Sequence, residues 1–354
     1  MKKLPTKPNY KTGIERAVLK FENCIKYPDL VELLGIELSK LQLLSIDPPY
    51  KRWHIRKKSG GLREIEDPQY PLKSVLRILN HYLQCVYYGW RPDSVFGFCY
   101  STRNELERNV ISNASRHIGN AYMVNIDLLS FFHAISASRV HDIYRKLLPN
   151  AEEEVIRLIS TLSVLKSRLP MGAPTSPALS NFACLEMDAE LMSWSEAANV
   201  TYTRYADDLS FSSHFELNEK DLAYIRSVII HHSFTVNEKK VFHYKPSNIK
   251  IVTGLVVGAE EVELPQNYLN DLQGEIKRLA AAKLIDMRYD SGHKNIKLQR
   301  FEQEIRGKLN FAGMVDRQNA TKMNLLYHDF ESAIAPDLKD QAISWLDVPY
   351  EFLP

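Results

Sequence analysis

The chain has 354 residues, of which 45% are hydrophobic and 25% charged, as in an ordinary globular protein. Its formal net charge of +2 excludes a polyelectrolyte, and no segment approaches the roughly 18 consecutive apolar residues of a membrane span. No apolar run follows the start of the chain, so we expect no secretory signal and a soluble, cytoplasmic protein.

The positions of the charged residues and of the cysteines say more than their totals. Residues 51–77 carry eight Lys and Arg against three acids, and residues 277–308 carry nine against four, so each stretch has a local charge of +5. Either stretch is a candidate surface for a polyanion, although solvated helix faces explain them equally well. The four cysteines show no CxxC spacing and no clustering with histidine, so we expect buried thiols and no zinc site.

The first third of the chain predicts helices around one hairpin. Apolar residues recur at helical spacing over the first 45 or so residues. Residues 51–66 alternate and break at Ser59-Gly60-Gly61, which predicts a β-hairpin. Pro71 then opens a long helical pattern.

The middle of the chain predicts a buried strand followed by helices. Residues 121–126 form an apolar run that ends at Asp127. Helices are predicted from Ser138 to about residue 148 and over 151–165. The segment 169–177, with three prolines and a glycine, cannot be regular structure, and Ser176 before Pro177 predicts an N-cap and a first helical position.

A second hairpin is predicted over residues 201–213, with Ala206, Asp207 and Asp208 at its tip. A helix over 220–232, strands over 241–257 and basic helices from about residue 266 complete the pattern. This order predicts an α+β fold with helices packed on one face of an antiparallel sheet.

Three aspartates carry the chemistry that we expect. Asp127 ends a predicted strand, and Asp207 and Asp208 stand at a hairpin tip 80 residues later. Adjacent strands of one sheet would bring them together, and two or three carboxylates can hold two Mg²⁺ ions about 3.5–4 Å apart. An Asp-Asp pair in a turn is commonplace when taken alone, so the ordered set of motifs decides the interpretation.

That ordered set resembles the reverse transcriptases. Asp127-Leu-Leu-Ser-Phe-Phe132, then Leu169-Pro-Met-Gly-Ala-Pro-Thr-Ser-Pro177, then Tyr205-Ala-Asp-Asp208 follow the order of that family. Further matches are to the bacterial retron enzymes, and they extend the resemblance over roughly residues 50–315. They are Lys57-Lys-Ser-Gly-Gly-Leu-Arg-Glu-Ile65, Asn113-Ala-Ser-Arg-His117, Val252-Thr-Gly-Leu255 and Arg306-Gly-Lys-Leu-Asn-Phe311.

The resemblance implies a metal site. Asp127, Asp207 and Asp208 would be the catalytic carboxylates, with Asp208 the least certain direct ligand. The backbone carbonyl of Leu128 would complete the shell of the two Mg²⁺ ions, for which Mn²⁺ is an alternative.

The resemblance also implies a nucleotide site. Phe132 would exclude a ribose 2′-OH and so select dNTPs, and Arg63 with Lys58 or Lys57 would clamp the triphosphate. Gly172 would shape the floor under the base pair, and Lys240 is a candidate proton donor to the leaving pyrophosphate. Phe132 as a core aromatic and Lys240 as a surface lysine are the plain alternatives. Met171 departs from the Gln usual in the family, which affects nucleotide selection more than metal chemistry.

The RNA-binding candidates are Asn113, His117, Arg306 and Lys308. Asn113 and His117 are four residues apart and would share a helix face. A structural hydrogen-bonding pair is as good an interpretation of these two as an RNA contact. The basic stretch that holds Arg306 and Lys308 suits a helical thumb gripping an RNA stem by its phosphates.

The resemblance implies a right-hand polymerase. The expected fingers are residues 1–120 and 140–170, the palm 121–139 and 171–260, the thumb 261–320, and residues 321–354 a C-terminal tail. A retron enzyme would bind its own structured non-coding RNA of the msr-msd type, prime from an RNA 2′-OH, and make a branched RNA–DNA product (msDNA). Such enzymes act in anti-phage defence, usually with a separate effector protein.

Two alternatives stay open at this point. One is a group II intron-like or abortive-infection reverse transcriptase, against which the chain shows no endonuclease motif and no long maturase segment. The other is a non-catalytic RNA-binding scaffold with a polymerase fold, which the presence of all three aspartates disfavours.

Overall fold

The computed structural model describes residues 12–56, 60–102, 105–288, 295–316 and 320–335. The chain divides into two compact units, residues 1–248 and 249–354. Each unit has its own hydrophobic core.

The first unit mixes helices and strands. Its helices are α1 (Thr12–Glu22), α2 (Tyr27–Leu34), α3 (Leu38–Ile46), α4 (Leu72–Trp90), α5 (Val110–Ser115), α6 (Ala137–Leu147), α7 (Glu153–Ser163), α8 (Ser176–Ala197), α9 (Glu219–His231) and the 3₁₀ helix η1 (Glu238–Lys240). Its strands are β1 (Tyr50–Arg56), β2 (Leu62–Pro68), β3 (Tyr122–Asp127), β4 (Thr201–Tyr205), β5 (Asp208–Ser213) and β6 (Phe242–Tyr244).

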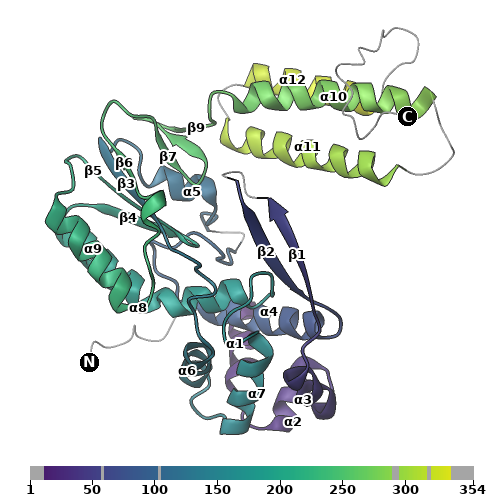
Figure 1. Ribbon diagram of the computed structural model, residues 1–354, viewed down its shortest axis with the longest axis vertical. Helices are drawn as coiled ribbons and strands as arrows, with labels where there is room; N and C mark the ends of the chain where they lie inside the picture. Colours follow the sequence, from purple (N-terminus) through teal and green to yellow (C-terminus); the bar gives the residue numbers. More distant parts are fainter. Residues whose placement is uncertain (1–11, 57–59, 103–104, 289–294, 317–319, 336–354) are drawn as a thin grey trace. The chain divides into compact units, whose positions relative to one another are not determined.

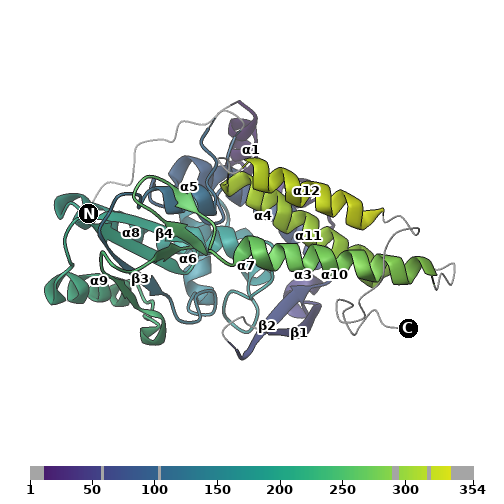
Figure 2. The same ribbon diagram turned by 90° about the horizontal axis from the view of Figure 1, so that it is seen from above.

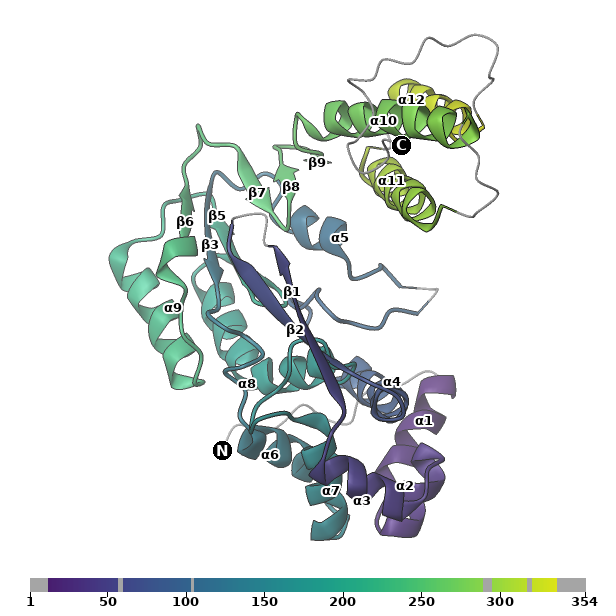
Figure 3. The ribbon, with the colours of Figure 1, turned by 45° about the vertical axis from the view of Figure 1, so that its right-hand side comes forward.

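The predicted N-terminal helices and the first hairpin are confirmed. Helices α1, α2 and α3 lead into β1, which pairs with β2 in antiparallel register from Tyr50↔Pro68 to Arg56↔Leu62 (Figure 3). Gly60 and Gly61 have φ of 84° and 80°, a left-handed conformation that glycine adopts without a steric penalty. Helix α4 follows β2 and buries Leu72, Val75, Leu76, Leu79 and Leu83 at helical spacing.

The central sheet is antiparallel and has the strand order β4-β5-β3-β6 (Figure 1). One of its faces packs on helices. Trp194 of α8 meets Phe211 of β5 edge-on at a ring separation of 6.2 Å and lies 5.7 Å from Tyr224 of α9. The predicted α+β fold, with helices on one face of an antiparallel sheet, is confirmed.

The described part of the second unit contains a small sheet and three helices. Strands β7 (Lys250–Val252), β8 (Leu255–Val257) and β9 (Val262–Glu263) pair in that order. Helices α10 (Tyr268–Arg288), α11 (Ile296–Val315) and α12 (Ala320–Ile334) lie side by side (Figure 2) around a core that includes Leu279, Ile305 and Phe330.

Some observed boundaries differ from the predicted ones. The division between units falls at residues 248 and 249, inside the expected palm, and the bounds of fingers, palm and thumb stay predictions. Helix α12 extends through much of the expected tail, and residues 336–354 lie outside the described residues. Helix α8 begins at Ser176 with Thr175 as its N-cap. The prediction of Ser176 as N-cap was wrong by one residue, because its hydroxyl donates to the carbonyl of Pro170 at 2.7 Å instead of accepting from the helix.

Candidate active site

The three predicted aspartates meet at one end of the central sheet. Asp127, the last residue of β3, is the direct cross-strand partner of Asp208, the first residue of β5. The amide of Leu128 donates to the carbonyl of Asp207 at 2.9 Å, which ties the strand end to the hairpin turn. Residues 80 positions apart in sequence are therefore brought together, because β3 and β5 are neighbours.

The turn itself is tightly packed. Ala206 has a φ of 58°, in the left-handed region that non-glycine residues seldom occupy. Gly97 lies directly against it, and a Cβ atom on Gly97 would stand 2.5 Å from the amide nitrogen of Ala206. Only a glycine at position 97 lets the two backbones approach this closely.

Asp127 is held by two residues that follow α9. The Nζ of Lys240 lies 2.6 Å from Asp127 Oδ2, and the Nδ2 of Asn237 donates to Asp127 Oδ1 at 2.8 Å. The bond to Asp127 raises the pKa of Lys240 and keeps its ammonium charged. Asp127 is only 7% exposed. The ammonium of Lys240 therefore supplies the positive charge that this nearly buried carboxylate needs.

In the other two carboxylates, desolvation and neighbouring negative charges outweigh the nearby positive charges of Lys240 and Arg63. Desolvation and the negative charge of Asp127 raise the pKa of Asp207. Desolvation and the charges of Asp207 and Asp127 raise the pKa of Asp208 to about 7. Asp208 remains exposed at the surface, so solvent screens part of this effect. Crowded carboxylates with raised pKa values are typical of sites that bind cations.

The side chains do not yet form a complete ligand set. Among the residues that the structure describes, no group of three or more His, Cys, Asp or Glu is arranged to hold a metal ion as it stands. Both oxygens of Asp127 are already bonded to Lys240 and Asn237. The carboxyl donors fit Mg²⁺ chemically, and a metal bound at Asp127 Oδ2 would compete with Lys240 for that oxygen.

The β1–β2 hairpin is attached to the loop that follows α7. The amide of Glu66 donates to the carbonyl of Met171 at 2.7 Å, and Gly172, with a φ of 133°, leaves no room for a Cβ beside the carbonyl of Glu66. The fully buried Glu66 carboxylate accepts two bonds from Arg168, at 2.8 and 3.2 Å. Burial would raise the pKa of Glu66, but Arg168 and the charges of nearby His133 and Arg52 lower it.

Two side chains of the predicted nucleotide site, Arg63 and Phe132, lie among the described residues. Arg63 of β2 is exposed, and its charge lowers the pKa of Asp207, so it lies within electrostatic reach of the turn. Phe132 is partly buried and lies 6.1 Å from the ring of Phe98. Lys57 and Lys58 lie outside the described residues.

Asn113 and His117 are buried, at 1% and 0% exposure. His117 Nδ1 lies 2.7 Å from the hydroxyl of Ser212 and Nε2 lies 2.8 Å from that of Thr203, so the imidazole joins the segment after α5 to two strands of the sheet. Desolvation lowers the pKa of His117 to about 3. Burial and these bonds favour the structural interpretation of the pair over a direct RNA contact.

Arg306 and Lys308 lie on α11 in the second unit, and acidic neighbours accompany both. Lys308 Nζ lies 2.8 Å from both Glu275 and Glu304. Arg306 stacks over the ring of Phe330 at 4.9 Å and lies 3.6 Å from Glu302. A phosphate contact from either residue would compete with these carboxylates.

Several polar residues that support the site had no role predicted from the sequence. Asn237 bonds Asp127, Glu66 fixes the hairpin, and Asp188 and Asn181 on α8 bond the buried Arg204 beside the turn. Arg204 directly precedes the Tyr205-Ala-Asp-Asp208 motif, and this adjacency was the one sequence signal available for it.

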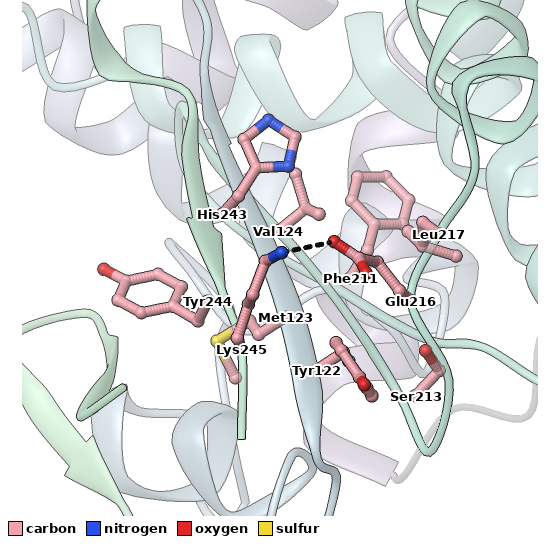
Figure 4. A pocket seen from close by; sticks show the side chains of 10 residues that line it. All are labelled: Tyr122, Met123, Val124, Phe211, Ser213, Glu216, Leu217, His243, Tyr244 and Lys245. Atoms are coloured by element: carbon pink, nitrogen blue, oxygen red, sulfur yellow. Dashed lines mark ion pairs between the residues drawn. The ribbon is translucent and has the colours of Figure 1, made fainter. Parts of the chain in front are cut away.

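A hollow lies at the end of the central sheet opposite to the carboxylate cluster. It is lined by Tyr122 and Met123 at the start of β3, Ser213 at the end of β5, and Lys245, which pairs with Glu216 at 3.5 Å (Figure 4). Strand residues rise about 3.3 Å each, so five residues of β3 separate this hollow from Asp127 by roughly 17 Å. It is distinct from the carboxylate cluster.

The three free thiols of Cys24, Cys85 and Cys184 are buried and that of Cys99 is partly buried, as predicted. Among the described helices, none is both long enough and apolar enough to cross a membrane.

Comparison with known proteins gives consistent matches. The family model described as reverse transcriptase (RNA-dependent DNA polymerase) matches residues 55–257. Retron Ec86 reverse transcriptase of Escherichia coli is 26% identical over 263 residues, covering 73% of this chain and 79% of the relative. Retron Mx162 reverse transcriptase of Myxococcus xanthus is 30% identical over 271 residues, covering 67% of this chain and 54% of the relative.

A third relative, retron Ec73 reverse transcriptase of Escherichia coli, is 30% identical over 182 residues. That alignment covers 49% of this chain and 55% of the relative, so the match spans about half the length of two of these three relatives. Among solved structures, apo telomerase from Candida tropicalis aligns with a TM-score of 0.45 and 11% identity, covering 81% of this chain and 61% of that one.

Proposed function

Because this chain belongs to the reverse transcriptase (RNA-dependent DNA polymerase) family, we propose that it copies a structured non-coding RNA into DNA as the polymerase of a retron. The predicted enzyme class and the predicted retron type agree with the family model and with the retron relatives. The observation that carries the proposal is the cross-strand pairing of Asp127 with Asp208, beside Asp207.

The carboxylates would hold two Mg²⁺ ions, with Mn²⁺ as an alternative. Such ions lower the pKa of an attacking hydroxyl and stabilise the leaving pyrophosphate. Asp127, Asp207, Asp208 and the carbonyl of Leu128 are the proposed ligands. The raised pKa values of Asp207 and Asp208 support this role, since added positive charge would relieve their mutual repulsion.

Lys240 would have two successive partners. It now bonds Asp127 Oδ2. Once released, its Nζ would carry a proton within reach of the same site, which suits a donor to the departing pyrophosphate. Release from Asp127 would also remove the bond that raises the pKa of Lys240, which would make its ammonium a better proton donor.

The nucleotide would lie between the hairpin and the sheet. Arg63, together with Lys58 or Lys57, would bind the triphosphate, and the ring of Phe132 would exclude a ribose 2′-OH. Met171 and Gly172 would lie under the base pair. The bond from Glu66 to the carbonyl of Met171 supports this arrangement, since it links the hairpin to that loop.

The retron assignment brings a specific RNA partner. The proposed template and primer are the chain's own msr-msd type RNA, primed from a 2′-OH, with msDNA as the product. Arg306 and Lys308 would contact this RNA, while Asn113 and His117 would act by fixing α5 on the sheet. A role in anti-phage defence with a separate effector protein belongs to the same proposal.

One experiment tests the polymerase proposal. The purified protein is incubated with Mg²⁺, labelled dNTPs and either a generic primed RNA or the RNA encoded beside its gene. We expect Asp207→Asn to reduce incorporation by at least about a hundredfold, because it removes charge that stabilises the transition state. The matched control is Asp142→Asn, because the Asp142 carboxylate is exposed on α6 and is not part of the carboxylate cluster.

Two results would contradict the proposal at different levels. Equal incorporation by wild type and Asp207→Asn would remove the metal role of the aspartates. Incorporation on the generic RNA without any product joined to the neighbouring RNA would leave a reverse transcriptase and remove the retron assignment.

A further inference from the structure

We propose that the buried Asp188–Arg204 ion pair, with Asn181, positions the catalytic turn by holding the carbonyl of Ala206. This inference rests on the proposed function, since it assigns positioning residues to the carboxylates named there. Neither Asp188 nor Asn181 lies in the motifs that identify the family in this sequence.

Arg204 reaches the turn from the helix-covered side of the sheet. It lies in β4, two residues before Ala206, and both its side chain and that of Asp188 on α8 are 0% exposed. Arg204 Nε lies 2.7 Å from Asp188 Oδ1 and Nη2 lies 2.6 Å from Oδ2, a bidentate pair. This pairing fixes the plane of the guanidinium.

The remaining nitrogen of the guanidinium acts on the turn. Arg204 Nη1 donates to the carbonyl of Ala206 and to Asn181 Oδ1, each at 3.1 Å. Asn181 Nδ2 in turn donates to the carbonyl of Gly97 at 3.0 Å. One guanidinium therefore connects α8, the turn and the segment that packs against the turn.

The segment around Gly97 supports the turn independently. The amide of Arg204 donates to the carbonyl of Ser94 at 2.8 Å, and the amide of Phe96 donates to the carbonyl of Arg204 at 2.9 Å. Ala206 is 8% exposed and has a positive φ. A strained residue persists only where its surroundings hold it, and the Arg204 bond and the close approach of Gly97 both restrain Ala206 directly.

The chemistry requires arginine. Burial would lower the pKa of Arg204, but Asp188 raises it well above the usual value, so the group stays charged. Lysine at this position would also pair with Asp188, yet its single ammonium has no planar fork to reach Asn181 and Ala206 together. Arg204→Lys therefore removes the positioning contact and keeps the charge balance.

The test compares Arg204→Lys with a matched control, Arg139→Lys. Arg139 is a partly buried arginine that, like the fully buried Arg204, bonds α8, through the carbonyl of Ala183 at 2.6 Å, but its bonds do not reach the turn. The first measurement is hydrogen exchange of the amides of residues 206–209 and of Leu128 in metal-free protein. The second is Mn²⁺ binding followed by electron paramagnetic resonance, and the third is dNTP incorporation.

We expect Arg204→Lys to speed exchange in the turn by at least about tenfold and to weaken Mn²⁺ binding. Incorporation should fall on the order of a hundredfold in kcat with little change in KM for the primed RNA, as a displacement of about 1 Å would cause. Arg139→Lys should leave exchange at the turn and Mn²⁺ affinity at the wild-type values.

Equal exchange and equal Mn²⁺ affinity in the two variants would overturn the inference. If Arg204→Lys does not fold, the double variant Asp188→Leu/Arg204→Met replaces the pair without leaving a charge unpaired, and the same two measurements decide. If wild-type protein binds Mn²⁺ but incorporates no dNTP, the proposed function fails while exchange and Mn²⁺ binding still judge the positioning role.

Discussion

The two faces of the central sheet carry buried polar networks of different kinds. On the helix-covered face, Arg204 and Asp188 form an ion pair that extends to the carbonyl of Ala206. On the opposite face, neutral His117 bonds the hydroxyls of Thr203 and Ser212. Thr203 and Arg204 are consecutive in β4, so strand alternation alone sends them to opposite networks.

Because one network is charged and the other neutral, the two can serve different purposes. A bidentate ion pair fixes direction as well as distance, which suits it to holding a catalytic turn. A neutral imidazole between two hydroxyls satisfies buried polar atoms and attaches a covering segment at no cost in buried charge. We therefore expect the charged network to govern the active site and the neutral network to govern stability in a pH-dependent way.

The largest effect is expected from breaking the charged network on one side. Arg204→Met leaves the Asp188 carboxylate buried without a counter-charge, which should lower the free energy of unfolding by about 3–5 kcal/mol. Asp188→Leu/Arg204→Met should regain most of that stability, because no charge remains unpaired. Urea unfolding at pH 7.5 measures both, and a double variant no more stable than the single one would show that the charge is not the cause.

An intermediate effect is expected from the neutral network. His117→Gln loses at least one of two buried bonds and should cost about 2 kcal/mol at pH 7. The pKa of His117 is about 3 in the folded protein and near 6.5 when unfolded. The unfolded chain binds the extra proton between these values, so wild-type stability is fully present above pH 6.5 and falls as the pH drops.

The free energy of unfolding of wild type should therefore exceed that of His117→Gln by less at low pH, and this difference should narrow by about 1 kcal/mol for each pH unit below 6.5. Urea unfolding at several pH values between 4 and 8 gives this slope. The difference in free energy of unfolding between wild type and Asp188→Leu/Arg204→Met should not change with pH over pH 6–8. A flat difference for His117→Gln would mean that its imidazole is not held neutral.

Sequence patterns were sufficient for the elements that bring the aspartates together. An apolar run ending at Asp127 and an alternating hairpin around Asp207 predicted strand ends and a turn, and neighbouring antiparallel strands then leave little freedom. The enzyme class predicted from the motifs agrees with the family model over residues 55–257, and the retron type agrees with the retron relatives.

The supporting contacts could not be predicted in the same way. Arg204 in an alternating strand fits a solvent-facing arginine equally well, and its partner Asp188 lies on a helix 16 residues earlier in the chain. Only the packing of α8 on β4 brings the two together. The prediction that Asn113 and His117 share a helix face was wrong, because α5 ends at Ser115 and His117 lies in the turn after it. Their burial could not be predicted either, because spacing along the chain does not tell whether a residue meets a sheet or a ligand.

The smallest effect is expected at Asp208, where solvent screens the charges. Its pKa is raised to about 7 in the folded protein from about 3.8, so the folded state holds the proton more strongly between these values. Wild-type stability should thus fall as the pH rises from 4 to 7 and stay reduced above that. Asp208→Asn removes this cost, so in EDTA its Tm should exceed that of wild type at pH 8 and match it near pH 4.

Adding Mg²⁺ at pH 8 should reverse that order at Asp208. A cation that binds the folded state raises its stability by RT ln(1 + [L]/Kd), and Asp208→Asn lacks one of the charges that attract the cation. Thermal melts with and without Mg²⁺ measure the change. If Mg²⁺ raised the Tm of wild type no more than that of Asp208→Asn, the raised pKa values at this end of the sheet would reflect only local repulsion between the carboxylates. Lys240 would then be the cation that balances their charge.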